Sequence, residues 1–162
     1  MTWKKVEKNI LETTNFLKNN IELSPYTQND PIKCNNCLFR MISILIVSGK
    51  INTTKINYEQ NKIRNFKKYK HGPEKNSTKP HGAIWHNNMM NMIKNYFEHH
   101  CLNVYSEPNL HYGQADLYVK EISTYIEVGS INLYKLYLNF SFMSECKILI
   151  VPSDFYSVEF KM

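Results

Sequence analysis

Residues 112–129 read YGQADLYVKEISTYIEVG, and this stretch decides the fold. Asp116 and Glu127 each fall in a short run rich in β-branched and aromatic residues, which predicts two adjacent strands joined by a tight turn near Lys120 and Glu121. The two carboxylates would then face each other. Because ionised acids repel at close range, such a pair favours a bound divalent cation, and oxygen ligands suit Mg²⁺ or Mn²⁺. The alternative is two solvent-facing acids beside an ordinary hairpin.

Four further elements are expected around these two strands. The pattern predicts a helix for residues 82–100, a strand for 102–110, a helix for 131–142 and a strand for 147–151. The first helix has an apolar stripe at helical spacing, formed by Trp85, Met89, Met92, Ile93, Tyr96 and Phe97. The last run is continuously hydrophobic, as expected of a strand that is covered on both faces. The predicted order is α-β-β-β-α-β.

This order resembles the core of the restriction-endonuclease-like, or PD-(D/E)XK, nuclease superfamily, and in particular its archaeal resolvase-like branch, over residues 81–152. The resemblance implies an α/β fold with a restriction-endonuclease-like α-β-β-β-α-β core, in which helices flank a mixed sheet. It also implies that Mg²⁺ or Mn²⁺ is bound by Asp116 and Glu127, which match the family's ligands on the second and third strands. The backbone carbonyl of Val128 is implied as a further ligand.

The same resemblance bears on other positions. Glu107 stands where archaeal resolvase-like members often carry an acid, and His86 stands where many members place a Glu or His that reaches toward the metal. One position departs from the pattern, because the family's lysine, which offsets charge in the transition state, is Gly129 here. Lys135, in the following helix, is predicted to swing back and supply that charge. The alternative for Lys135 is a solvated lysine on the helix surface.

Charge and composition favour an anionic partner. The chain has 162 residues, a formal net charge of +6 and a pI near 9.0. Residues 61–80 combine basic side chains with Phe66 and Tyr69, which suits phosphate neutralisation together with base stacking. We expect nucleic acid, with DNA as the leading candidate, to contact Arg64, Lys67, Lys68, Lys70, Lys75 and Lys79. The alternative is a solvated linker, since residues 71–82 are rich in Gly, Pro, Ser and Asn.

The chain divides near residue 80 into a helical N-terminal region with the basic loop, residues 1–80, and a nuclease-like core, residues 81–162. The N-terminal region has predicted helices at residues 3–19 and 32–48, and a polar helix or extension from residue 54 to about residue 68. The last two segments could form an ordinary helical hairpin or a helix-turn-helix. The helix-turn-helix would present to DNA the residues Lys55, Asn57, Gln60, Asn61 and Arg64.

The cysteines, the hydropathy and the tyrosines bear on zinc binding, cellular location and oligomeric state. Cys34 and Cys37 form a CxxC pair, which supplies half of a zinc site, and the alternative is a pair of core cysteines. The absence of a signal-peptide or membrane-span pattern leads us to expect an intracellular protein, cytoplasmic or in the nucleoid. Tyrosine-rich strand edges are compatible with a homodimer surface, through Tyr112, Tyr118, Tyr125, Tyr134 and Tyr137.

Together these patterns predict a metal-dependent nuclease that hydrolyses DNA phosphodiester bonds. Asp116 and Glu127 would bind the metal, Lys135 would stabilise charge, and His86 or Glu107 would tune the metal or the water. The alternative is a nuclease-fold protein that has lost cleavage and acts as a nucleic-acid-binding or complex-assembly module. A third hypothesis is a structural domain in which the acids are incidental. The sequence leaves open DNA versus RNA, the preferred substrate structure or sequence, and the oligomeric state.

Overall fold

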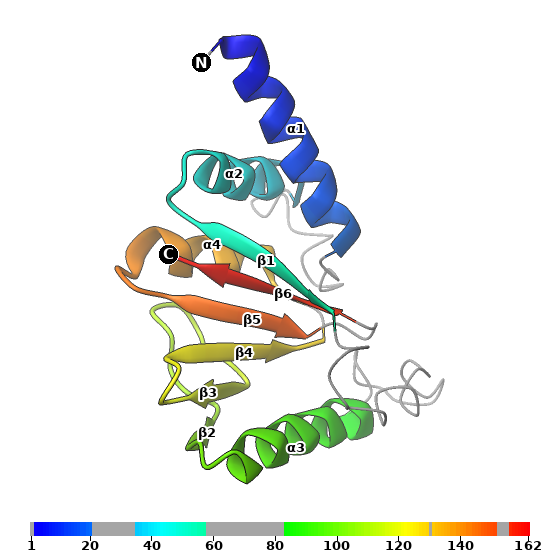
Figure 1. The fold of residues 1–162 in the computed structure, drawn as a ribbon, viewed down its shortest axis with the longest axis vertical. Helices are drawn as coiled ribbons and strands as arrows, with labels where there is room; N and C mark the ends of the chain where they lie inside the picture. The colour runs from blue at the N-terminus through cyan, green and yellow to red at the C-terminus, as the bar shows by residue number, and fades with distance from the viewer. Residues whose placement is uncertain (1, 21–34, 58–82, 130, 152–155) are drawn as a thin grey trace.

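A computed structural model describes residues 2–20, 35–57, 83–129, 131–151 and 156–162 (Figure 1). The helices are α1 (Trp3–Asn20), α2 (Asn35–Val47), α3 (Ala83–His99) and α4 (Leu133–Phe142). The strands are β1 (Asn52–Asn57), β2 (Val104–Ser106), β3 (Leu117–Val119), β4 (Thr124–Val128), β5 (Lys147–Val151) and β6 (Tyr156–Lys161). Within the described residues, these strands form one six-stranded sheet in the order β1-β6-β5-β4-β3-β2.

The sheet is mixed. Strand β4 runs parallel to β5, and every other neighbouring pair of these strands is antiparallel. Because parallel strands cannot be joined by a tight turn, α4 provides the crossover between β4 and β5. The elements from α3 to β5 follow the order α-β-β-β-α-β, and the predicted α/β class with a mixed sheet and helices is confirmed. Membership of the nuclease superfamily stays a prediction.

Two hydrophobic clusters lie on opposite faces of the sheet. The first cluster packs α1, α2 and α4 against β5 and β6, and the second packs α3 against β3, β4 and β5. Side chains alternate along β5, so that Ile148 and Ile150 belong to the first cluster while Leu149 and Val151 belong to the second. This strand is therefore covered on both faces, as its continuous hydrophobicity predicted.

Helices α1 and α3 follow their predicted spans, with one exception in the apolar stripe of α3. Met89 and Ile93 of α3 are buried against the sheet, but Tyr96 is 41% exposed because its ring contacts Phe97 and His100 instead. The start of α1 extends past the sheet (Figure 1), and Trp3, the first residue of this helix, is exposed. The side chain of Trp85 lies outside the described set. No helix in the described part of the chain is long and apolar enough to cross a membrane.

The N-terminal region differs from the expectation at β1. Residues 52–57 form a strand that pairs with β6, so no helix begins at residue 54; residues 58–68, the rest of the predicted polar helix or extension, lie outside the described residues. Thr53, Thr54 and Ile56 are β-branched, which favours a strand, and β6 offers it an edge. Strand β6 has no counterpart among the predicted elements. The sheet thus takes strands from both sides of residue 80, and the proposed domain boundary stays a prediction.

Candidate active site

Asp116 lies immediately before β3, where the chain enters the sheet from the loop of residues 107–116. The N–H of Asp116 donates to the carbonyl of Ile126 (3.1 Å), and the N–H of Val128 donates to the Asp116 carboxylate oxygen Oδ2 (2.7 Å). In a longer β3, a backbone carbonyl would accept this bond from β4. Here the carboxylate of Asp116 accepts it instead. One carboxylate oxygen is fixed by this bond, and the other, Oδ1, faces α3.

His86 is the partner of that second oxygen. Its Nε2 atom lies 3.3 Å from Oδ1 of Asp116. His86 precedes Met89, Met90 and Ile93 at helical spacing, which directs it to the face of α3 that packs on the sheet. The hydrogen bond to Asp116 raises the pKa of His86, while burial opposes this by lowering it. The contact therefore favours the cationic imidazole.

Glu127 points to the other face of the sheet. Its neighbours Ile126 and Val128 belong to the second cluster, so strand alternation directs Glu127 toward α4. There the ammonium nitrogen of Lys135 lies 2.6 Å from Oε1 of Glu127, and the two side chains are only 17% and 10% exposed. Glu127 and Lys135, eight residues apart in the sequence, therefore form a largely buried ion pair.

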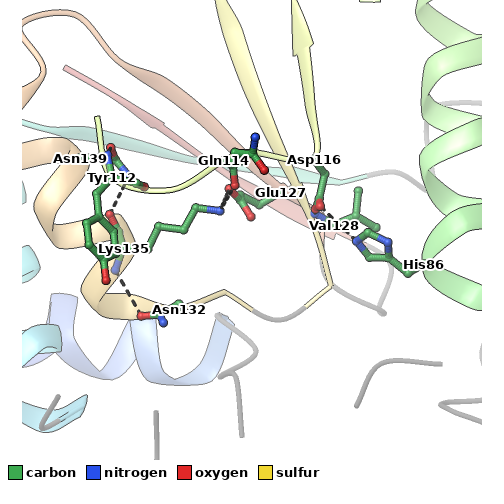
Figure 2. A network of polar contacts seen from close by, with 9 residues as sticks. All are labelled: His86, Tyr112, Gln114, Asp116, Glu127, Val128, Asn132, Lys135 and Asn139. Carbon is green, nitrogen blue, oxygen red and sulfur yellow. Dashed lines mark hydrogen bonds and ion pairs between the residues drawn. The ribbon is translucent and has the colours of Figure 1, made fainter. Parts of the chain in front are cut away.

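The four ionisable groups form a line from Lys135 through Glu127 and Asp116 to His86, with a cation at each end and the two acids between them (Figure 2). This differs from the expectation that the two carboxylates point at each other. The reason is local, because Asp116 is turned toward the backbone of Val128 and each acid has a cation of its own. Mutual repulsion between the acids is thus relieved in part within the chain, without requiring a metal.

Burial nevertheless disfavours the ionised form of Glu127. Burial raises the pKa of Glu127 to about 7, the Lys135 cation opposes this rise, and the Asp116 charge adds to it. Oε1 is buried, and the Lys135 ammonium at 2.6 Å is its charged partner. Burying an ionised carboxylate costs free energy that Lys135 offsets only in part, and a bound cation would offset more of it.

Lys135 reaches this position from the first turn of α4. The side chain of Asn132 caps the helix by accepting bonds from the N–H groups of Tyr134 and Lys135. The Lys135 ammonium also donates to the backbone carbonyl of Gln114. Its stem passes Gly113, whose φ of +77° favours glycine. The lysine is thus directed over the strand ends, as predicted, and its catalytic role stays a prediction.

Asn139 fastens the loop of residues 107–116 to α4, and nothing in the sequence analysis singled it out. Its side chain is fully buried, accepts from the N–H of Tyr112 (2.9 Å) and donates to the carbonyl of Tyr112 (3.0 Å) (Figure 2). It also donates to the carbonyl of Lys135 (2.9 Å). One available signal was a single amide among the apolar residues of α4, although the sequence alone does not identify its backbone partner.

Two other predicted positions behave differently. Glu107 is exposed with φ +51°, and its backbone N–H, not its carboxylate, bonds to the carbonyl of Asp116 (2.9 Å). Gly129, at the position of the family's lysine, has φ +88°, a conformation that a lysine would adopt only with strain. Its N–H donates to the carbonyl of Val151 (2.8 Å). The backbone at residue 129 is therefore built for glycine.

The remaining site predictions fall largely outside the described residues. This holds for Cys34 and for the whole basic segment, Arg64, Lys67, Lys68, Lys70, Lys75 and Lys79. Cys37 is exposed in α2, and zinc binding stays untested. Among the residues that the structure describes, no group of three or more His, Cys, Asp or Glu side chains could hold a metal ion. Any cation here would need backbone or water ligands besides the two acids.

Neither a scan against protein-family models nor searches of curated proteins and of solved structures finds a significant match to this chain.

Proposed function

We propose that this protein is a metal-dependent nuclease that hydrolyses phosphodiester bonds, with DNA as the expected substrate. The observation that supports this most is the buried Glu127 carboxylate, which lies between the Lys135 cation and the Asp116–His86 pair and whose pKa is raised to about 7. Perturbed ionisable groups gathered in this way are typical of functional sites. The net charge of +6 is consistent with a polyanionic substrate.

The oxygen-rich donor set suits Mg²⁺ or Mn²⁺. The carboxylates of Asp116 and Glu127 and the backbone carbonyl of Val128 would hold the ion. Mg²⁺ usually keeps several waters and takes only one or two protein carboxylates, so a cage of three side chains is not required. Bound there, the ion would polarise a phosphoryl oxygen and activate a water.

Lys135 would provide the positive charge that Gly129 lacks. Its ammonium is held by Glu127 and by the carbonyl of Gln114, so little reorganisation is needed to stabilise negative charge developing on the phosphoryl group. His86 would keep Asp116 oriented through the contact to Oδ1. These residues thus hold the charges that a phosphodiester transition state requires.

A non-cleaving nucleic-acid-binding or assembly module is the second candidate. It is favoured by the pairing of both acids with cations of the chain itself, which makes the arrangement stable without catalysis. The backbone of Gly129, unsuited to the family's lysine, points the same way. Cleavage separates the two candidates, since nucleic-acid binding is common to both.

The test is cleavage of labelled single strands, duplexes, flaps and four-way junctions by the purified chain in Mg²⁺, Mn²⁺ or EDTA. We expect cleavage of at least one substrate with either metal and none in EDTA. Glu127→Gln should be inactive, and Lys135→Ala should be slower by about 10²- to 10³-fold, the usual effect of removing one preorganised stabiliser. The exposed Glu145→Gln is the matched control and should cleave normally. Binding without any cleavage would leave the non-cleaving module in place of the enzyme.

A further inference from the structure

Two aromatic pairs lie where the loop of residues 107–116 meets α4. The rings of His111 and Phe142 are stacked, with centroids 5.2 Å apart and planes at 28°. The rings of Tyr112 and Tyr134 meet edge to face at 5.7 Å. Phe142 is 65% exposed and Tyr112 is 41% exposed, and His111 is also exposed. Aromatic surface from neighbouring side chains is thus presented to solvent, and exposed apolar patches can mark binding sites.

These rings stand on a rigid support. The two loop residues, His111 and Tyr112, are held through the backbone of Tyr112, which Asn139 binds by two hydrogen bonds. Tyr134 is partly buried against the first hydrophobic cluster, and Phe142 is the last residue of α4. Rigid aromatic groups lose little conformational entropy on binding, so this surface is prepared for a flat ligand.

The charge of the surface is compatible with an anionic chain. The acids of the loop stand at its two ends, Glu107 and Asp116, whereas residues 108–115 and α4 contain no Asp or Glu and carry the cations Lys135 and His111. The same elements hold the Lys135 ammonium at the candidate active site, through Gln114 and Glu127. A nucleic acid lying across the aromatic rings would therefore extend toward the candidate active site.

We propose that His111, Tyr112, Tyr134 and Phe142 form a stacking surface for unpaired nucleobases, so that the ligand of this protein is a nucleic acid with a single-stranded segment. This rests on the proposed function for its choice of ligand. Aromatic faces accept any base, since every base has a π-face, and duplex DNA keeps its bases stacked on each other. The two pairs lie eight residues apart along α4, about 12 Å, or three to four base steps.

The experiment measures binding in EDTA, which excludes cleavage, of a labelled single strand of roughly 12 nucleotides and of the matching duplex. The wild-type chain should bind the single strand more tightly than the duplex. Phe142→Ala and His111→Ala should each weaken single-strand binding by about 5- to 140-fold, which corresponds to the loss of one base stack. Phe142→Trp should restore the affinity, whereas Phe142→Leu, which keeps apolar surface without a ring, should not. Duplex binding should change little in any of them.

Tyr96→Ala is the matched control, because Tyr96 is as exposed as Tyr112 and also contacts a histidine ring, His100, but lies on α3. It should bind the single strand like the wild type. Equal single-strand affinity in Phe142→Ala and the wild type would overturn the stacking surface, whatever the cleavage assays find. Loss of a dimer in Phe142→Ala, with unchanged binding, would assign the rings to a second copy of the chain and overturn it too. Stacking with no cleavage by the wild type would uphold this inference and reject only the enzyme.

Discussion

Glu127 shows how one residue can be both a cost to the fold and a resource for chemistry. It is 10% exposed and lies beside another acid, Asp116, whose charge raises its pKa further. Lys135 offsets only part of this cost, since the pKa of Glu127 is still raised to about 7. A buried acid that titrates near neutral pH is suited to binding a cation in its ionised form and is expensive to maintain otherwise.

The raised pKa of Glu127 leads to a prediction for stability. The folded protein keeps a proton on Glu127 up to about pH 7, whereas the unfolded chain releases it near its ordinary value of 4.5. This contribution to stability is present below about pH 4.5 and is lost as pH rises to about 7. His86, whose pKa is also raised from 6.5, loses its contribution as pH rises above that value. Metal-free stability should therefore fall across this range.

Urea unfolding in EDTA at several pH values tests this. The stability of Glu127→Gln relative to the wild type should rise as pH increases from about 4.5 to 7, because the variant has no acid to ionise. Glu145→Gln, which changes an exposed acid, should follow the wild type at every pH. A constant difference between Glu127→Gln and the wild type would show that Glu127 titrates normally.

At the scale of elements, α4 organises the site. Its first turn supplies Lys135 to Glu127, and one turn later Asn139 fastens the loop of residues 107–116. That loop leads directly into Asp116 and provides the Gln114 carbonyl that holds the Lys135 ammonium. Helix α4, with ten residues, thus positions Lys135 beside Glu127 and holds the loop that leads to Asp116.

Asn139→Ala should consequently loosen the loop. It would leave the N–H and carbonyl of Tyr112 without their partner, at a cost on the order of 1–3 kcal/mol of unfolding free energy. Urea unfolding measures the cost, and limited proteolysis within residues 108–115 measures the loosening. Asn109→Ala, at an exposed position of the same loop, is the control and should cost little. Equal protease resistance in Asn139→Ala and the wild type would mean that the loop is held by other contacts.

The elements also show what the sequence could predict. Spans α1, α3, α4 and β5 follow from periodicity and from the continuous apolar run KILIV, because local pattern determines them. Strands β3 and β4 pair as predicted and bring Asp116 within electrostatic reach of Glu127, but local pattern does not predict the bond from the Val128 N–H that orients the Asp116 carboxylate. Strands β1 and β6 were missed because they stabilise each other only across more than half the chain. Asn139 was missed for the same reason, as its partner is a distant backbone.

For the whole molecule, the first hydrophobic cluster joins the two ends of the chain. Leu17, Phe39 and Ile42 from the N-terminal helices pack in one cluster with residues of α4, β5 and β6. The candidate site stands on α4 and β4, so its geometry depends on that cluster. The N-terminal helices are in this sense part of the support for the site.

A fragment of residues 81–162 should therefore fail to fold cooperatively. Removing α1, α2 and β1 would expose a large apolar face of α4 and β5 and leave β6 with a free edge. Circular dichroism on heating should show no sharp transition for the fragment and a clear one for the full chain. A cooperative transition in the fragment would instead support a domain boundary near residue 80.

The central claim is that Asp116 and Glu127 together bind a divalent cation, and the melting temperature as a function of Mn²⁺ concentration tests it most directly. At about pH 8, where Glu127 is ionised, a hundredfold excess over Kd should add about 2.7 kcal/mol, or roughly 5–11 °C in a chain of this size. Asp116→Asn, which keeps an oxygen for the Val128 N–H, should fold but show no such rise. A wild-type melting temperature that ignores Mn²⁺, or an equal rise in Asp116→Asn, would contradict the account.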